Sequence, residues 1–276
     1  MKIIFAKNIG FCSGVKRAIV IAEKSLKEDL KPIQFLGPLV HNEKVIEKLK
    51  NKGGKFVSNF KKIKSGTLIL RAHGEILNFK KLKKKKILIR DTTCPLVKRA
   101  QNVAYTLFKQ EYKVIIIGDK KHSETKGIKE YIKNQAIIIE NEKEAKRLPK
   151  FKKIGVLAQT TQNLDRVNQI LKILKNKTKK FKWVNTICSE VLIRQKELSE
   201  ILKKVNGVLI IGSHSSANTK RLVEIVKNSK KPIWWINSLK ELKKISFKNL
   251  SILGVVSGTS TPDYEIKKIK KYLLKK

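Results

Sequence analysis

Residues 114–124 read VIIIGDKKHSE, an apolar run that ends in a glycine and a polar turn. A continuous run of Val and Ile is typical of a strand that is buried on both faces, as in parallel sheets. A helical pattern follows the turn, so the stretch predicts a strand, a turn and a helix. In such sheets, ligands bind beyond the carboxyl ends of the strands. The stretch therefore indicates an α/β fold whose turns contain functional residues.

The same unit occurs three times along the chain. The apolar runs at residues 33–36, 114–117 and 208–211 each lead into a glycine and then a helical pattern. The residues four and six positions beyond these glycines are His41 and Glu43, His122 and Glu124, and Ser216 and Asn218. Later in each third, another apolar strand ends in a polar turn, and these turns contain His73, Thr160 and Ser260. The repeat predicts three pseudo-symmetric α/β domains with parallel sheets, at residues 1–94, 95–187 and 188–276.

The three cysteines repeat in the same way. Cys12 and Cys94 are each followed by Lys-Arg-Ala at the fourth to sixth positions, and Cys188 opens a looser copy. Each precedes a helical pattern, and a helix N-terminus favours the thiolate. Taken singly, each could be an inert buried thiol. An odd number without a Cys-x-x-Cys pair argues against a disulfide framework and a zinc ribbon. Three thiolates indicate a metal centre with one open position, either zinc or an iron–sulfur cluster.

Histidines and hydroxyls dominate the other repeated turns. Three of the four histidines fall there, whereas His214 is expected to have a local structural role. An isolated Ser, Thr or Asn at such a place is usually a helix N-cap. Together they form a ring of donors suited to phosphate: His41, His73, His122, Thr160, Ser216, Asn218 and Ser260. Glu43 is expected to be a first-turn helix residue, which the helix dipole favours. Glu124 has two interpretations, the same structural role or that of a proton carrier.

The net charge of +42 suggests a polyanionic partner. The lysines are nevertheless spread along the chain, and the densest cluster, at residues 80–86, has no interleaved aromatic residues. We therefore expect a solvated basic surface that binds nucleic acid weakly, without sequence preference and with strong dependence on salt. Because no run approaches the ~18 apolar residues of a membrane span, and the apolar start is too short for a signal peptide, we expect no membrane association and a cytoplasmic protein.

Several of these stretches, in order along nearly the whole chain, resemble the LytB-type 4-hydroxy-3-methylbut-2-enyl diphosphate reductases. They are GFCSGV at 10–15, VHN at 40–42, AHG at 72–74, TCPLV at 93–97, QTT at 159–161, IC at 187–188 and STPD at 260–263. The resemblance implies three α/β domains around one [4Fe–4S] cluster per chain, with Cys12, Cys94 and Cys188 as its ligands. It also implies the last step of the non-mevalonate isoprenoid pathway, which makes isopentenyl diphosphate and dimethylallyl diphosphate.

By the same resemblance, the diphosphate of the substrate is held by His41, His73, His122, Ser216, Asn218 and Ser260. Thr160 and Glu124 face its hydroxyl end, and Glu124 delivers protons. The electrons are expected from a donor of the ferredoxin or flavodoxin type. Without the resemblance, two alternatives remain: a metal-free nucleic-acid-binding protein, and a cluster-bearing electron carrier. The electron carrier would leave the histidine and serine turns without a purpose.

Three positions depart from the family pattern. Ser123 stands where proline is usual, Ala217 where a second serine is usual, and Val191 where threonine is usual. Ala217 removes one potential phosphate donor. If that contact has been lost, Ala217→Ser should tighten substrate binding by roughly 0.5–1.5 kcal/mol, and no change would mean that water or a lysine already supplies it.

Overall fold

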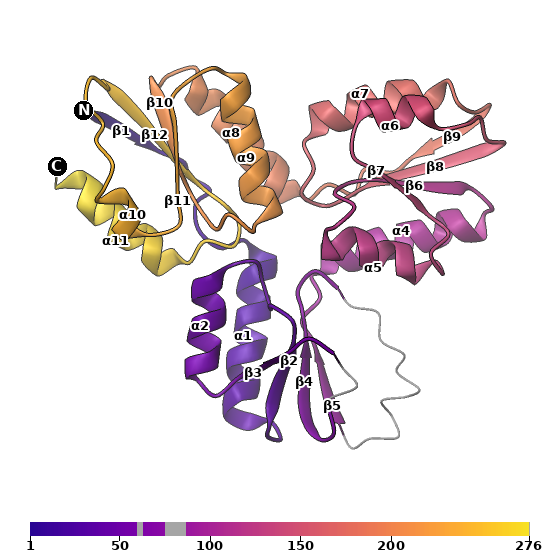
Figure 1. Cartoon of the computed structure of the whole chain (residues 1–276), viewed down its shortest axis with the longest axis horizontal. Helices are drawn as coiled ribbons and strands as arrows, with labels where there is room; N and C mark the ends of the chain where they lie inside the picture. The colour runs from indigo at the N-terminus through magenta and orange to yellow at the C-terminus, as the bar shows by residue number, and fades with distance from the viewer. Residues whose placement is uncertain (60–62, 75–86, 276) are drawn as a thin grey trace.

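The computed structural model describes residues 1–59, 63–74 and 87–275, which form three lobes around a common centre (Figure 1). Each lobe contains a four-stranded parallel sheet whose two central strands are largely apolar and buried. Helices pack on these sheets, so the predicted α/β fold with three pseudo-symmetric domains is confirmed.

The first lobe has the strand order β3-β2-β4-β5. Its strands are β2 (Ile33–Leu36), β3 (Lys55–Val57), β4 (Gly66–Leu70) and β5 (Ile87–Asp91). The helices α1 (Ser13–Glu28) and α2 (Glu43–Asn51) cover one face, where Phe35 is fully buried in the apolar core.

The second lobe repeats this order as β7-β6-β8-β9. Its strands are β6 (Lys113–Ile117), β7 (Ile137–Ile139), β8 (Lys153–Ala158) and β9 (Lys180–Trp183). On one face lie α4 (Pro95–Lys109) and α5 (Ser123–Tyr131), and on the other α6 (Glu142–Arg147) and α7 (Leu164–Lys175).

The third lobe is built from the two ends of the chain. Its strands, in the order β1-β12-β10-β11, are β1 (Lys2–Phe5), β12 (Ile252–Ser257), β10 (Gly207–Ile211) and β11 (Ile233–Ile236). The helices α8 (Ser189–Leu202) and α9 (Ala217–Asn228) cover one face, and α10 (Leu239–Leu242) and α11 (Asp263–Leu274) the other.

Strand β1 belongs to the third lobe, whereas the predicted domain boundaries placed residues 1–94 together in the first domain. It pairs in parallel with β12, from Lys2 opposite Ile252 to Phe5 opposite Val255. It thereby takes the edge position that β5 and β9 hold in the other two sheets. In every lobe this edge strand leads through a cysteine into the first helix of the next lobe. The three cysteines therefore lie where the chain crosses between lobes, which explains why they meet.

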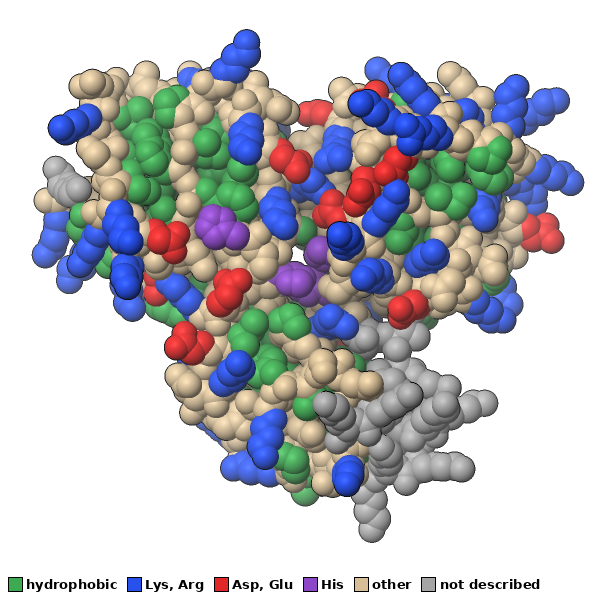
Figure 2. Space-filling model, in the orientation of Figure 1, with side chains coloured by type: hydrophobic (Ala, Val, Ile, Leu, Met, Phe, Trp, Pro, Cys, Tyr) green, Lys and Arg blue, Asp and Glu red, His purple; other side chains and the backbone are tan. Residues whose placement is uncertain are grey.

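Lysine and arginine side chains are spread over the visible surface of all three lobes (Figure 2). Histidine side chains are visible near the centre where the lobes meet and also on the third lobe, at the upper left. The lysine cluster at residues 80–86 lies outside the described residues. Among those that are described, no helix is long and apolar enough to cross a membrane.

Candidate active site

The turns at the carboxyl ends of the strands meet at the centre of the molecule and line one cavity. Every side chain that the sequence predicted for the site lines it: Cys12, Cys94, Cys188, His41, His73, His122, Glu124, Thr160, Ser216, Asn218 and Ser260. Apolar side chains, among them Val40, Leu96 and Val191, complete the wall. The structure thus brings the predicted residues together from all three lobes.

Each cysteine is the N-cap residue of a helix, namely Cys12 of α1, Cys94 of α4 and Cys188 of α8. All three thiols are free and half-buried. The Cys12 sulfur accepts the N–H of Val15 at 3.4 Å, whereas Cys94 and Cys188 have no capping bond. Three sulfurs therefore approach one cavity from three helix N-termini, whose dipoles favour negative charge on sulfur.

Burial opposes that ionisation. It raises the pKa of Cys12 to about 11 and also raises the pKa of Cys188, and the charges of nearby cysteines and Glu190 add to both effects. The thiolates of Cys12 and Cys188 are therefore disfavoured unless a metal cation binds them, and either a zinc ion or a multi-iron centre would supply that charge.

Gly14, in the first turn of α1, provides room beside the sulfurs. A Cβ atom at this position would lie 2.8 Å from the Cys94 sulfur and 4.0 Å from the Cys12 sulfur. The glycine therefore keeps free a space that any other residue would fill. The three cysteines, the apolar wall and this space are the features expected of a site for the [4Fe–4S] cluster that the resemblance implies.

Three histidines from two lobes form a compact cluster. The ring centroids of His41 and His73 are 4.3 Å apart, and each lies 5.3 Å from that of His122. His122 accepts the backbone N–H of Glu124 at its Nδ1 atom, at 3.1 Å. In the neutral ring the proton is consequently on Nε2, which is buried and has no partner among the described residues. That nitrogen is thus a donor without an acceptor.

Burial keeps these rings neutral. It lowers the pKa of His122 to about 4, lowers that of His73 well below its usual value, and lowers that of His41. The positive charges of Arg71 and Lys220 lower the pKa of His41 further. A bound anion would reverse these shifts, because it favours the protonated ring.

The cluster could in principle hold a metal ion, since its ligand nitrogens lie within 4.8 Å of one another. Two observations favour an anion instead. The charges of Arg71 and Lys220, which act on His41, would repel a dication. Among the described residues, no carboxylate joins the three ring nitrogens to balance the charge of a dication, and the Glu124 oxygens accept hydrogen bonds from Thr160 instead.

The third lobe supplies neutral donors opposite the histidines. Ser216 is the N-cap of α9 and accepts the N–H of Thr219 at 3.3 Å. Asn218 is buried, and neither atom of its amide has a hydrogen-bond partner in the described part of the chain. Ser260, which follows β12, donates to the carbonyl oxygen of His41 at 3.2 Å. A buried amide without hydrogen-bond partners, such as that of Asn218, is energetically costly. The site is therefore arranged for a polar ligand.

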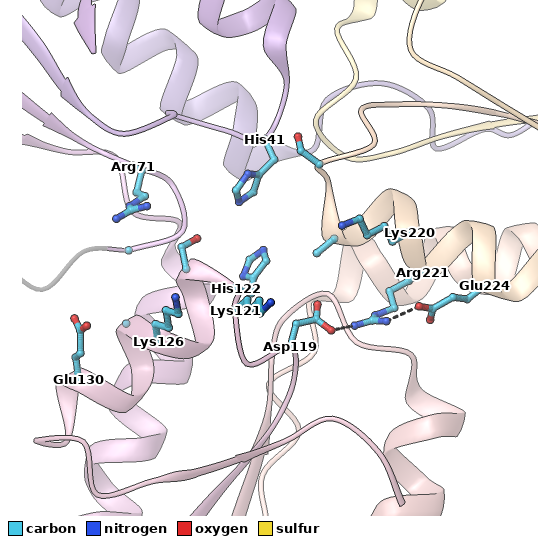
Figure 3. Close-up of a pocket in the computed structure, with 15 residues that line it drawn as sticks. His41, Arg71, Asp119, Lys121, His122, Lys126, Glu130, Lys220, Arg221 and Glu224 are labelled. Carbon is cyan, nitrogen blue, oxygen red and sulfur yellow. Dashed lines mark hydrogen bonds and ion pairs between the residues drawn. The ribbon is translucent and has the colours of Figure 1, made fainter. Parts of the chain in front are cut away.

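A second cavity, of about 620 Å³, opens outside the histidine cluster and shares His41 and His122 with the first. Figure 3 shows basic side chains around it: Arg71, Lys121, Lys126, Lys220 and Arg221. Acidic residues also line it, and Asp119 and Glu224 both pair with Arg221. The way into the histidine cluster is therefore predominantly positive.

Contacts between lobes, which the sequence did not predict, position these turns. Arg221 of α9 pairs with Asp119, in the turn before His122. Glu43 is the first residue of α2, as expected, but its carboxylate also accepts hydrogen bonds from Ser213 at 2.9 Å and Asn237 at 3.2 Å in the third lobe. In the sequence, only the presence of a charged residue, Asp119 or Glu43, between a strand and a helix indicated such a contact.

His214 lies outside both cavities. Its ring centroid is 4.2 Å from that of Trp235, which is consistent with the predicted local structural role.

Comparisons with known proteins agree with the site. Residues 3–274 match the family described as LytB protein. The chain is 42% identical over 275 residues to the 4-hydroxy-3-methylbut-2-enyl diphosphate reductase of Dictyoglomus turgidum, with 98% of this chain and 95% of that protein covered. It is 36% identical to the enzyme of the same name from Geobacter metallireducens, with 98% and 95% covered.

Two solved structures are also similar. The E-1-hydroxy-2-methyl-but-2-enyl-4-diphosphate reductase from Plasmodium falciparum superimposes with a TM-score of 0.92 at 32% identity, with 99% of this chain and 87% of that one covered. An (E)-4-hydroxy-3-methyl-but-2-enyl diphosphate reductase, described as the terminal enzyme of the non-mevalonate pathway, gives 0.72 at 34% identity with both chains fully covered. The repeat, the cysteine turns and these similarities lead to one conclusion: the chain belongs to the LytB family of 4-hydroxy-3-methylbut-2-enyl diphosphate reductases.

Proposed function

We propose that this chain removes the hydroxyl group of (E)-4-hydroxy-3-methylbut-2-enyl diphosphate by reduction and forms isopentenyl diphosphate and dimethylallyl diphosphate. The chain is an oxidoreductase, and this reaction is the last step of the non-mevalonate isoprenoid pathway. The observation that carries the proposal is the convergence of three groups in one cavity: the cysteine N-caps, the buried histidines and the Glu124–Thr160 pair. The reaction requires electrons, binding of the diphosphate and a proton donor. The cysteines, the histidines and the Glu124–Thr160 pair correspond to these three requirements in that order.

We assign one [4Fe–4S] cluster per chain to Cys12, Cys94 and Cys188. When bound, such a cluster supplies electrons singly and leaves one iron without a cysteine ligand, open as a Lewis acid. The helix N-termini favour the three thiolates. Val191, buried near the start of α8, belongs to the same apolar cluster as Cys188 and shields this end of the cavity from water.

The diphosphate is assigned to the opposite end of the cavity. His41, His73 and His122 present buried ring nitrogens that have no partner among the described residues, and Asn218 presents an unpaired amide. A buried polar group without a hydrogen bond costs about 1–3 kcal/mol, so phosphate oxygens would relieve several such costs at once. Ser216 adds a hydroxyl donor, and Ser260 would exchange its bond to the His41 carbonyl oxygen for one to a phosphate oxygen.

Glu124 is assigned as the proton donor. Breaking the C–O bond by reduction consumes two electrons and two protons and releases water. The Thr160 hydroxyl lies 2.7 Å from a Glu124 oxygen and donates to the ionised carboxylate. When Glu124 is protonated this bond reverses: the carboxyl proton passes to the Thr160 oxygen, and the Thr160 proton passes to the departing oxygen. The second proton is added to carbon, and the choice between the two allylic positions determines which product forms.

The electrons are proposed to come from a small protein of the ferredoxin or flavodoxin type in the cytoplasm. Because the surface of this chain is strongly basic, an acidic donor would be attracted to it. A chemical reductant should replace the protein donor in a test.

The test is anaerobic purification followed by iron analysis and an assay with excess chemical reductant. We expect about four irons per chain, the content of a [4Fe–4S] centre, and both diphosphate products. Cys12→Ser, Cys94→Ser and Cys188→Ser should each lose most of the iron, whereas Ser189→Ala, at an exposed neighbouring position, should retain it. Stoichiometric zinc without iron would refute the cluster. Full iron without conversion of the substrate would instead indicate an electron carrier.

A further inference from the structure

One side of the outer cavity, which lies outside the histidine cluster, has an apolar side chain at the start of α9, where a hydrogen-bond donor could contact a phosphate. At the start of α9, Ser216 and Asn218 provide polar groups to the inner cavity, but the residue between them is Ala217. Ala217 lines both cavities, and its methyl group makes no hydrogen bond. A phosphate group that extends from the histidines into the outer cavity therefore meets an apolar surface on this side.

Lys220 lies one helical turn after Ala217 and consequently on the same face of α9. It lines the outer cavity and forms no ion pair within the described residues. Its positive charge lowers the pKa of both His41 and His122, so the ammonium group is near both rings. Figure 3 shows Lys220 at the edge of the cavity that these histidines also line.

Ser123, the first residue of α5, lines the same cavity. Its hydroxyl oxygen is buried and has no hydrogen-bond partner in the described part of the chain. A buried hydroxyl in this state is unfavourable unless a ligand engages it. The residue is adjacent to His122, so it is well placed to extend the contact of that histidine with an anion.

The ion pair between Arg221 and Asp119 fixes the two residues relative to each other. Arg221 follows Lys220 on α9 and is only 5% exposed, and Asp119 lies in the turn that leads to Ser123. Glu224, at 2.7 Å, holds the other side of the same guanidinium group. The start of α9 and the start of α5 are thereby tied together on the wall of one cavity.

We propose that Lys220 and Ser123 bind the terminal phosphate of the substrate in the outer cavity and supply the contact that Ala217 lacks. The inference rests on the proposed function, because it assigns further residues to the diphosphate. The terminal phosphate carries the larger share of the negative charge, so a lysine near it gains more than a hydroxyl would.

Binding of inorganic diphosphate and of the substrate to the anaerobic, cluster-loaded chain tests this, by titration calorimetry. Lys220→Met should weaken both by about tenfold and Ser123→Ala by about threefold, as expected for charge-assisted and neutral hydrogen bonds. Lys227→Met removes the same charge two turns further along α9, away from both cavities, and should have no effect. Ala217→Ser should change little by itself but should restore most of the affinity lost in Lys220→Met.

The outcomes separate the two levels of the proposal. Equal effects of Lys220→Met and Lys227→Met, or no effect of either, would overturn the assignment of Lys220. An unchanged affinity in Ser123→Ala would overturn that of Ser123. His41→Ala serves as the reference for the inner site: if it binds diphosphate as tightly as the unsubstituted chain, the proposed function itself fails. Circular dichroism and iron content should match across the variants.

Discussion

Glu124 accepts two hydrogen bonds from Thr160, one from the backbone N–H at 2.6 Å and one from the hydroxyl at 2.7 Å, each to a different carboxylate oxygen. Both bonds favour the ionised carboxylate, but burial outweighs them and raises the pKa of Glu124 to about 7. The group therefore changes its protonation state at neutral pH while it contacts a hydroxyl on the wall of the cavity. This combination is what a general acid requires.

Glu124→Gln tests this role directly. Glutamine preserves the shape of the side chain but has no proton to transfer. The variant should keep its iron and bind substrate within about tenfold, while turnover with excess chemical reductant falls by roughly 10²–10⁴, the usual contribution of a positioned general acid. A loss below about tenfold would reduce Glu124 to a residue that stabilises the start of α5.

The pH dependence of turnover should follow the same carboxyl group. As the pH rises through about 7, Glu124 loses its proton and the rate should fall. Because the Thr160 hydroxyl lowers the pKa of Glu124, Thr160→Val should shift this decline to higher pH in addition to slowing the reaction, whereas Thr160→Ser should preserve the profile. Identical profiles in all three chains would assign the titration to another group.

Binding of diphosphate should be coupled to uptake of protons. The histidine cluster is largely neutral near pH 6.5, because burial lowers the pKa of all three rings, and an anion beside them raises those values again. We expect uptake of about one proton per diphosphate at this pH. Calorimetry in buffers of different ionisation enthalpy measures it, and the Glu124→Gln chain removes the contribution of that carboxyl. No uptake in that chain would show that the rings bind the anion as neutral donors.

Much of the site could be predicted from sequence because carboxyl ends of parallel strands share one edge of a sheet. Once the repeat was found, the matching turns placed His41, His122 and Ser216 at equivalent positions, and the structure brings them to one cavity. The assignment of β1 failed because a four-residue strand has no local signal for its partner. Its pairing with β12 joins the two ends of the chain.

Contacts between lobes were beyond the reach of sequence patterns for a similar reason. The pairing of Asp119 with Arg221 depends on how the second and third lobes are oriented, which no local periodicity encodes. Gly14 was visible in the repeated cysteine stretch, but its equivalent after Cys94 is Leu96, so the comparison gave no reason to single it out. Only the distance to a sulfur from another lobe shows why a side chain is excluded there.

Gly14→Ala is the sharpest test of the space beside the cysteines. In a helix, alanine is normally favoured over glycine by about 1 kcal/mol, so a purely local view predicts a more stable chain. The added Cβ would instead lie 2.8 Å from the Cys94 sulfur, in the space assigned to the proposed cluster. We therefore expect iron, measured after anaerobic reconstitution, to fall to a small fraction of the roughly four per chain of a [4Fe–4S] centre, although all three cysteines remain. Gly127→Ala is the matched control, because Gly127 also lies in a helix, α5, and a Cβ atom there would be no closer than 3.8 Å to its nearest neighbour. Equal iron in the two variants would show that the cluster does not occupy the space beside Gly14.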